Sequence, residues 1–206
     1  MNLDLVIVGA GGHARVVLDT LQAMGKKVSG FLDDREALWG TSLAGLPVLG
    51  SVELLSDVQQ AVIAIGNNAI RQKIAHDHPH VEWICAVHPT AYVSPTARVG
   101  AGTVVFARAV VQPDARIGQH VIVNTASTVD HDSIIEDHVH LAPGCHLAGS
   151  VHVREGAFLG VGTCVIPGIN IGAWSTVGAG ATVTAPVPER QTVVGTPARP
   201  IKPKTQ

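Results

Sequence analysis

One histidine lies between two carboxylates, in the segment Asp130-His131-Asp132. A neighbouring carboxylate can hold an imidazole in one tautomer and stabilise its protonated form, as in any pair of a base and its orienting acid. The ordinary pKa of a histidine is about 6.5, which suits a general base near neutral pH. We therefore take His131 as a candidate base and Asp132 as its partner. The alternative is a solvated histidine in a polar strip.

The other histidines offer no comparable arrangement. Seven of the eleven histidines fall between residues 88 and 152, and their spacing matches no zinc ligand set, so we expect no metal. His120 and His138 are 18 residues apart, and we expect them to be solvated neighbours on one outer surface. His140, His146 and His152 recur at intervals of six residues, which places them near successive corners of a repetitive fold.

A glycine-rich turn, Gly9-Ala10-Gly11-Gly12-His13-Ala14, follows the first apolar stretch. It departs from the dinucleotide fingerprint G-x-G-x-x-G only at the third glycine, where alanine is tolerated. The segment Asp33-Asp34-Arg35 comes about twenty residues later, and Gly66-Asn67 follows another apolar strand. Ligands gather at the carboxyl ends of parallel strands, so these segments predict a nucleotide pocket. A tight strand–helix turn without a ligand is the alternative.

A valine, isoleucine or leucine recurs at every sixth position from Val87 to Val183. This period fits neither a helix, at about 3.6 residues, nor an alternating strand, at about 2. It predicts a solenoid of parallel β-coils, in which each hexad forms one flat face and three hexads close a triangular turn of 18 residues. Gly149 then lies directly above His131. An accessible glycine N–H beside the base is a candidate oxyanion donor.

The first part of the chain has a different pattern. Strands are predicted at 5–8, 28–32 and 61–65, and helices at 14–24 and 69–76, an order that predicts a small parallel sheet. The sheet is too small for a full dinucleotide fold, so a nucleotide-sugar fits better than NAD. We predict a Rossmann-like nucleotide-sugar-binding domain over 1–80 and a β-helix domain over 81–206 with a closing C-terminal tail.

Composition narrows the partners of this 206-residue chain. The net charge is −2 and no basic patch is interleaved with aromatics, which argues against nucleic acid. No stretch approaches the roughly 18–20 apolar residues of a membrane helix, and the N-terminus carries an acidic residue where a signal peptide needs positive charge. The three cysteines show no metal spacing, so we expect reduced thiols and a cytoplasmic protein.

Five motifs carry a resemblance over nearly the whole chain. They are I-V-G-A-G-G-H-A-R-V-V at 7–17, F-L-D-D at 31–34, I-G-N-N at 65–68, N-T-A-S-T-V-D-H-D at 124–132 and V-V-G-T-P-A-R at 193–199. With them, residues 87–200 resemble the left-handed parallel β-helix (hexapeptide-repeat) acyltransferases. The whole chain resembles the sialic acid O-acetyltransferase family, in its branch acting on nucleotide-linked 4-amino-sugars of the bacillosamine and perosamine pathways. The resemblance implies acetyl-CoA as co-substrate and a homotrimer with sites between subunits.

The resemblance also implies roles for individual residues. His131 matches the catalytic base, Asp132 its acidic neighbour, and Gly149 the backbone donor to the thioester carbonyl. Asn124 matches an active-site polar residue, and His140 a histidine beside the thioester arm of acetyl-CoA. The adenosine end is expected around residues 160–185, with Pro167 and Gly168 in contact. The positions expected around the acceptor are Gly11, Gly12, His13, Asp33, Asp34, Arg35, Gly66 and Asn67.

We predict an acetyltransferase that moves acetyl from acetyl-CoA to the amine of a nucleotide-linked amino-sugar of UDP or dTDP type. His131 removes a proton as the amine attacks the thioester, and the Gly149 N–H stabilises the oxyanion. No cysteine or serine has the surroundings of a nucleophile, so we expect direct transfer. Two alternatives stay open: O-acetylation of sialic acid or another sugar hydroxyl, and a non-catalytic, sugar-binding trimeric scaffold.

Overall fold

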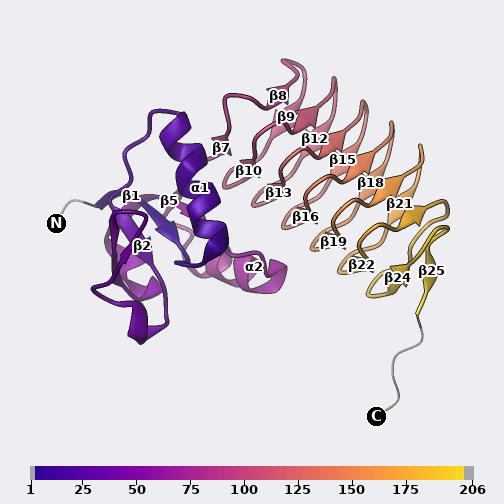
Figure 1. The fold of residues 1–206 in the computed structure, drawn as a ribbon. Coiled ribbons are helices and arrows are strands. Elements are labelled where there is room, and N and C mark those ends of the chain that lie inside the picture. The colour runs from indigo at the N-terminus through magenta and orange to yellow at the C-terminus, as the bar shows by residue number, and fades with distance from the viewer. Residues whose placement is uncertain (1–2, 202–206) are drawn as a thin grey trace, which may run out of the picture.

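The computed structural model describes residues 3–201, which form a small α/β unit followed by a long three-faced β-helix (Figure 1). The α/β unit is built on a six-stranded sheet in the order β3-β4-β2-β1-β5-β6. The strands are β1 (Leu3–Val8), β2 (Gly30–Leu32), β3 (Ser42–Leu43), β4 (Leu46–Gly50), β5 (Val58–Ile63) and β6 (Glu82–Trp83).

The central strand β1 pairs in parallel with β2 and β5, as the alternating strand and helix pattern predicts. The antiparallel β3–β4 hairpin is an addition that the sequence did not predict. Helix α1 (Gly12–Ala23) follows β1, and α2 (Asn68–Asp77) follows β5. Two short 3-10 helices, η1 (Glu36–Leu38) and η2 (Val52–Asp57), complete the unit. The carboxyl ends of β1 and β5 therefore open onto the two turns that precede the helices.

The β-helix has three faces made of two-residue strands, and β24 has three residues. The first face contains β7 (Ala86–Val87), β10 (Val104–Val105), β13 (Ile122–Val123), β16 (His140–Leu141), β19 (Phe158–Leu159), β22 (Thr176–Val177), β24 (Thr192–Val194) and β25 (Arg199–Pro200). The second contains β8 (Tyr92–Val93), β11 (Val110–Val111), β14 (Thr128–Val129), β17 (His146–Leu147), β20 (Cys164–Val165) and β23 (Thr182–Val183). The third contains β9 (Arg98–Val99), β12 (Arg116–Ile117), β15 (Ile134–Ile135), β18 (His152–Val153) and β21 (Asn170–Ile171).

Strand register confirms the coil of 18 residues. Val105 lies opposite Val123, and Val123 opposite Leu141, in parallel ladders along the first face. The six-residue series forms one buried core from Val105 onward, whereas Val87, Val93 and Val99 are only partly buried because they belong to the outermost coil. Apolar burial of this regular kind explains why the period is so strict along the chain.

The corners of the prism share one backbone conformation. A positive φ recurs at every sixth residue from Gly102 to Gly180, including Asp132 with a φ of 58° and Trp174 with a φ of 56°. This left-handed conformation turns the chain from one face to the next, and aspartate tolerates it better than most residues with a side chain. Asp132 is therefore fixed at a corner of the coil, directly after His131.

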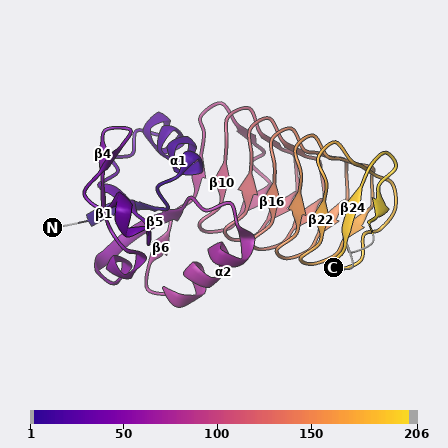
Figure 2. The same ribbon diagram turned by 60° about the horizontal axis from the view of Figure 1, so that its bottom comes forward.

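The α/β unit packs against the first face near the start of the coil (Figure 2). One apolar cluster joins Val17 and Leu18 of α1 to Val104, Phe106 and Ile122 of the coil. This packing leaves the corner between the second and third faces on the opposite side of the prism from the α/β unit.

The same contact corrects the expectation for His120 and His138. His120 is only 3% exposed. Its ring stacks on that of His138 at a centroid distance of 5.4 Å and meets Trp83 edge-on at 5.3 Å. The predicted stacking of the two rings is confirmed, but the prediction that both are solvated is wrong: β6 and α2 cover this corner, which buries His120 and half-buries His138.

The far end of the coil is closed by a change of strand direction. β24 continues the parallel ladder from β22, but β25 pairs antiparallel to β24. On the third face, a single bridge between Ile171 and Val187 ends the ladder, and prolines flank Val187 on both sides. Within residues 3–201, no helix is both long enough and apolar enough to cross a bilayer.

Candidate active site

His131 stands at the corner after β14 with its ring directed outward. Its Nδ1 lies 2.8 Å from Oδ2 of Asp132, and 59% of its side chain is exposed. The His131 backbone N–H donates to Oδ1 of Asp130 at 2.8 Å. Asp132 thus holds Nδ1 in its protonated state, which leaves Nε2 unprotonated and free to accept a proton.

The two flanking carboxylates also set the basicity of His131. The hydrogen bond from Asp132 raises the pKa of the imidazole above its ordinary value, and the charges of Asp130 and Asp132 act in the same direction. A carboxylate that stabilises the imidazolium makes the neutral ring a stronger base. The arrangement is that of a base with its orienting acid.

A column of backbone from the following coils lies over His131. His131 O accepts from Ser150 N at 2.9 Å, and Gly149 O accepts from Gly168 N at 3.0 Å, so Gly149 and Pro167 stack above His131. A Cβ at Gly149 would lie only 2.6 Å from Nε2 of His131. In the described part of the chain, the Gly149 N–H donates to no acceptor. The structure therefore brings together five predicted residues: His131, Asp132, Gly149, Pro167 and Gly168. We call this group the His131 column.

A second group of predicted residues lines a hollow at the carboxyl ends of β1 and β2. This hollow has a volume of about 320 Å³, and its walls include Gly11, Asp33, Asp34 and Arg35. Gly9 makes the turn possible, because its φ is 103° and a Cβ there would lie 3.0 Å from Ala64 O. We call this hollow the strand-end pocket.

The two aspartates that line the strand-end pocket, Asp33 and Asp34, make different contacts. Asp33 forms a bidentate ion pair with Arg35, in which Nε donates to Oδ1 and Nη2 donates to Oδ2, each at 2.8 Å. Oδ2 of Asp33 also accepts from Ala10 N at 2.8 Å. These hydrogen bonds, that from Arg35 foremost, lower the pKa of Asp33 to about 2. Asp34 instead accepts from Val52 N at 2.9 Å. Asp34 thus caps η2, a structural contact that the sequence did not predict.

The N-terminus of α1 opens beside Asp33. Gly11 is the cap residue, no side chain in the described part of the chain caps the helix, and no acidic residue lies in its first turn. A Cβ at Gly11 or Gly12 would meet no atom of residues 3–201 within 4 Å. Packing within the chain therefore does not require these glycines, and they leave the N–H groups of the helix end open to an anion.

Gly66 and Asn67 lie at a different hollow, of about 330 Å³, between the start of α2 and the coil. Asn67 caps α2 by accepting from Ile70 N at 3.0 Å. Phe158 and Trp174 form the coil side of this hollow. Six of the eight expected acceptor residues are therefore divided between two hollows, and the other two, Gly12 and His13 in the first turn of α1, line neither.

His140 links this hollow to the coil. Its Nδ1 lies 3.3 Å from Gly66 O, and its Nε2 lies 3.3 Å from Nδ2 of Asn124. Because Oδ1 of Asn124 accepts from Thr125 N at 2.9 Å, its NH₂ group must face His140. His140 is therefore neutral, with Nδ1–H donating to Gly66 and Nε2 accepting from Asn124.

Burial lowers the pKa of His140 to about 4, and the charge of Arg71 contributes. His13 lies 6.3 Å from His140 between ring centroids, and burial likewise lowers its pKa to about 4. Both nitrogens of His140 are already engaged, whereas Nε2 of His131 has no hydrogen-bond partner within residues 3–201. Of these two histidines, His131 has the geometry of a base.

Arg71 is the residue of this region that the sequence did not reveal. It lies in α2 and is only 1% exposed. Its guanidinium reaches from the α/β unit to backbone carbonyls of the coil. A helical pattern alone does not show which face of α2 meets another part of the chain.

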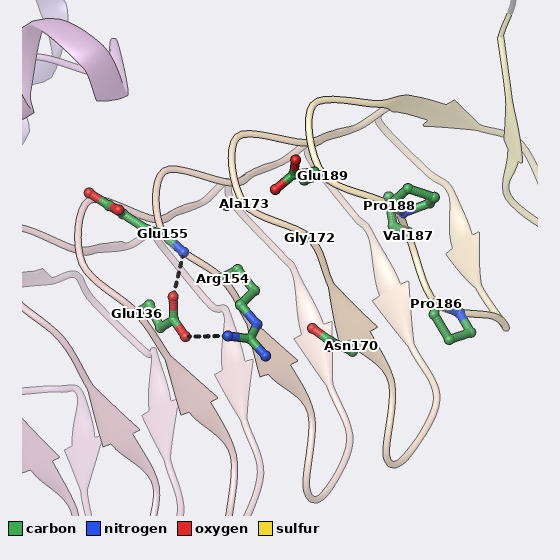
Figure 3. A pocket seen from close by; sticks show the side chains of 10 residues that line it. All are labelled: Glu136, Arg154, Glu155, Asn170, Gly172, Ala173, Pro186, Val187, Pro188 and Glu189. Atoms are coloured by element: carbon green, nitrogen blue, oxygen red, sulfur yellow. Dashed lines mark hydrogen bonds and ion pairs between the residues drawn. The ribbon is translucent and has the colours of Figure 1, made fainter.

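Other features of the described residues do not add to the site. No group of three or more His, Cys, Asp or Glu side chains among them could hold a metal ion. A hollow of about 500 Å³ on the third face, shown in Figure 3, includes Asn170, Gly172 and Ala173 from the range expected at the adenosine end, but no residue that was individually predicted for the site. There, both oxygens of Glu136 are engaged within the chain, by His152 and Arg154 on one side and Glu155 N on the other.

Comparison with known proteins identifies the relatives of this chain. Residues 4–78 match the family described as the PglD N-terminal domain. The acetyltransferase domain of PglB from Neisseria gonorrhoeae FA1090 is 37% identical, with a TM-score of 0.90 over 97% of this chain and 100% of that chain. A variant of perosamine N-acetyltransferase from Caulobacter crescentus, solved with CoA and GDP-perosamine, is 38% identical, with a TM-score of 0.93 over 97% of each chain.

A curated relative points in the same direction. UDP-N-acetylbacillosamine N-acetyltransferase of Bacillus subtilis is 41% identical over 111 residues, which are 50% of this chain and 51% of that protein. The matches span about half of the length of the first curated relatives or less. The full-length structural matches and the shared N-terminal domain show that the chain belongs to the left-handed β-helix acetyltransferases, in the branch of the bacillosamine and perosamine N-acetyltransferases.

Proposed function

We propose that this protein transfers the acetyl group of acetyl-CoA to the amine of a nucleotide-linked amino-sugar. One observation carries the mechanism: His131 is oriented by Asp132 and lies against Gly149, whose N–H has no acceptor among the described residues. The relatives solved with acetyl coenzyme A or with CoA and GDP-perosamine support the choice of substrates.

The reaction then needs only groups on the His131 column. The amine nitrogen attacks the thioester carbonyl, and Nε2 of His131 takes the proton that the nitrogen loses. The Gly149 N–H donates to the oxyanion of the tetrahedral intermediate. The C–S bond breaks, and the imidazolium, stabilised by Asp132, returns its proton to the departing thiolate. The products are an amide and free CoA, and the acetyl group passes directly from sulfur to nitrogen without an acyl-enzyme.

The acceptor would bind in the α/β unit. The open N-terminus of α1 suits the phosphates of a nucleotide, because its N–H groups and helix dipole favour negative charge. Asp33 is held ionised beside that helix end, where a carboxylate can accept a hydrogen bond from a ribose hydroxyl or a base.

Geometry favours an assembly in which two chains share each site. His131 lies at the corner between the second and third faces, whereas the α/β unit packs on the first face. An acceptor held by the α/β unit would therefore meet the His131 column of another copy. A head-to-tail contact of this kind closes into a ring, and the three-sided prism suits a trimer.

The test is release of CoA thiol from acetyl-CoA with a panel of UDP-, dTDP- and GDP-linked 4-amino-sugars. We expect turnover with at least one amino-sugar and none with the matching 4-hydroxy sugar. Turnover with sialic acid or a 4-hydroxy sugar alone would favour O-acetylation. A trimer that binds sugars without releasing thiol would favour the scaffold.

A further inference from the structure

Arg71 is a buried charge without an acidic partner. Among residues 3–201 it contacts no carboxylate, and its guanidinium is satisfied by oxygens of the α/β unit and of the coil. In the α/β unit these are Ile65 O at 2.9 Å and Asn68 Oδ1 at 3.0 Å. In the coil they are the carbonyls of His120 at 2.7 Å, His138 at 2.6 Å and Val139 at 3.4 Å. A buried cation is costly to desolvate, and a simple apolar contact would join the two parts more cheaply.

These contacts surround the hydrogen bond between Gly66 and His140. Ile65 and Asn68 lie on either side of Gly66, and His138 and Val139 directly precede His140 in the chain. One rigid guanidinium therefore fixes both ends of the bond from His140 Nδ1 to Gly66 O. Asn68 adds a second link, because its Nδ2 donates to Gly156 O at 3.0 Å and to Ala157 O at 3.2 Å in the coil.

We propose that Arg71 is a positioning residue, which holds the α/β unit on the coil and keeps His140 in its neutral Nδ1–H form against Gly66, one of the residues expected around the acceptor. The proposal rests on the proposed function for its kinetic consequence, but not for its structural one. Arginine suits this task better than lysine, since its planar fork can bind several carbonyls at once.

The charge of Arg71 supports the same role. The titratable groups that face it are His13 of α1 and three histidines of the coil: His120, His138 and His140. Burial lowers the pKa of each, and the Arg71 charge lowers it further, while Asp137 partly opposes the effect at His138. Protonation of His140 would place a second positive charge next to Arg71 and would remove Nε2 as the acceptor for Asn124.

The first test needs no activity measurement and no change at Arg71. NMR of the full-length protein with ¹⁵N-labelled histidine should show His140 as the neutral Nδ1–H tautomer at pH 7 and still neutral at pH 5.5. Assignment uses the loss of one imidazole signal in His140→Asn. A protonated ring, or the Nε2–H tautomer, at pH 7 would overturn the proposal whether or not the protein acetylates an amino-sugar.

The second test uses Arg71→Met, which keeps an unbranched apolar stem but removes the charge and the fork. We expect KM for the amino-sugar to rise by at least about tenfold, the factor of one hydrogen bond to a charged group, while KM for acetyl-CoA changes by less than about threefold. The His140 signals should broaden or titrate at higher pH. Arg116→Met, at an exposed position of the coil, is the matched control and should leave all three readouts unchanged.

Arg71→Lys keeps the positive charge but removes the planar guanidinium, and it is the alternative test if Arg71→Met does not fold. It should keep His140 neutral but still raise KM for the amino-sugar, because one ammonium group cannot bind the carbonyls on both sides. Wild-type KM values in Arg71→Lys, or equal losses for both substrates, would overturn the positioning role.

Discussion

Gly149 offers a direct test of the His131 column. A methyl group at position 149 would lie 2.6 Å from both Cε1 and Nε2 of His131. This is roughly 1 Å inside the 3.5–4.0 Å optimum for carbon contacts, so the imidazole or the coil must move. The ring is 59% exposed and swings more easily than the hydrogen-bonded backbone. Gly149→Ala should therefore displace the base by about 1 Å and leave the fold intact.

A displacement of that size in a reacting group lowers the rate by roughly 10²-fold. We expect kcat of Gly149→Ala to fall by about that factor in the thiol-release assay, with a melting temperature close to wild type. Ser150→Ala, at the next and exposed position, is the control and should retain its rate. In a double-mutant cycle, Gly149→Ala should have little further effect once His131 is already alanine. A Gly149→Ala enzyme within about threefold of wild-type kcat would refute the placement of the base beside this glycine.

Three further predictions follow from the site and its surroundings. His131→Ala should lower kcat by a factor of roughly 10²–10⁴ while the affinity for acetyl-CoA is retained. Since Asp132 raises the pKa of His131, kcat/KM should decrease on the acid side with a midpoint above pH ~6.5. In Asp132→Asn this midpoint should move to lower pH. Asp33→Ala should raise KM for the sugar with little effect on KM for acetyl-CoA, whereas Asp34→Ala should mainly lower the melting temperature, because it removes a cap of η2 worth about 1 kcal/mol. The free energy of unfolding measured in urea should be greatest above pH ~6.5 and fall as the pH drops to about 4, by up to about 3 kcal/mol for each of His13, His120 and His140. The reason is that these histidines bind protons in the unfolded chain in this pH range but not in the folded chain. A free energy of unfolding that does not change across this range would contradict their burial.

The coil could be predicted in detail because its sequence repeats its structure. Each hexad places one side chain inward, so the register from Val123 to Leu141 and the stacking of Gly149 over His131 follow from counting residues. The pairing of His131 with Asp132 is also local, because the two residues are adjacent and the left-handed corner fixes their geometry.

What covers the outer surface of the coil could not be predicted in the same way. The hexad shows that His120 points outward but not that Trp83 and α2 cover it, because that contact joins residues far apart in the chain. The contacts of Arg71 with the coil could not be predicted for the same reason. Asp34 lines the strand-end pocket, but its hydrogen bond from Val52 N at the start of η2 could not be predicted, because it joins residues far apart in the chain.

The closed end of the prism has a consequence for self-association. A parallel β-coil presents unpaired backbone groups at its last turn, and a second molecule could extend the ladder there and start a fibre. In this chain the first face ends in β25, a two-residue antiparallel strand made of Arg199 and Pro200. Proline lacks the N–H that a further strand would need, and arginine adds a charge to the edge. Pro186 and Pro188 do the same beside the last bridge of the third face. These residues thus end the hydrogen-bonded ladders of the coil, and end-to-end stacking of molecules is disfavoured at this end.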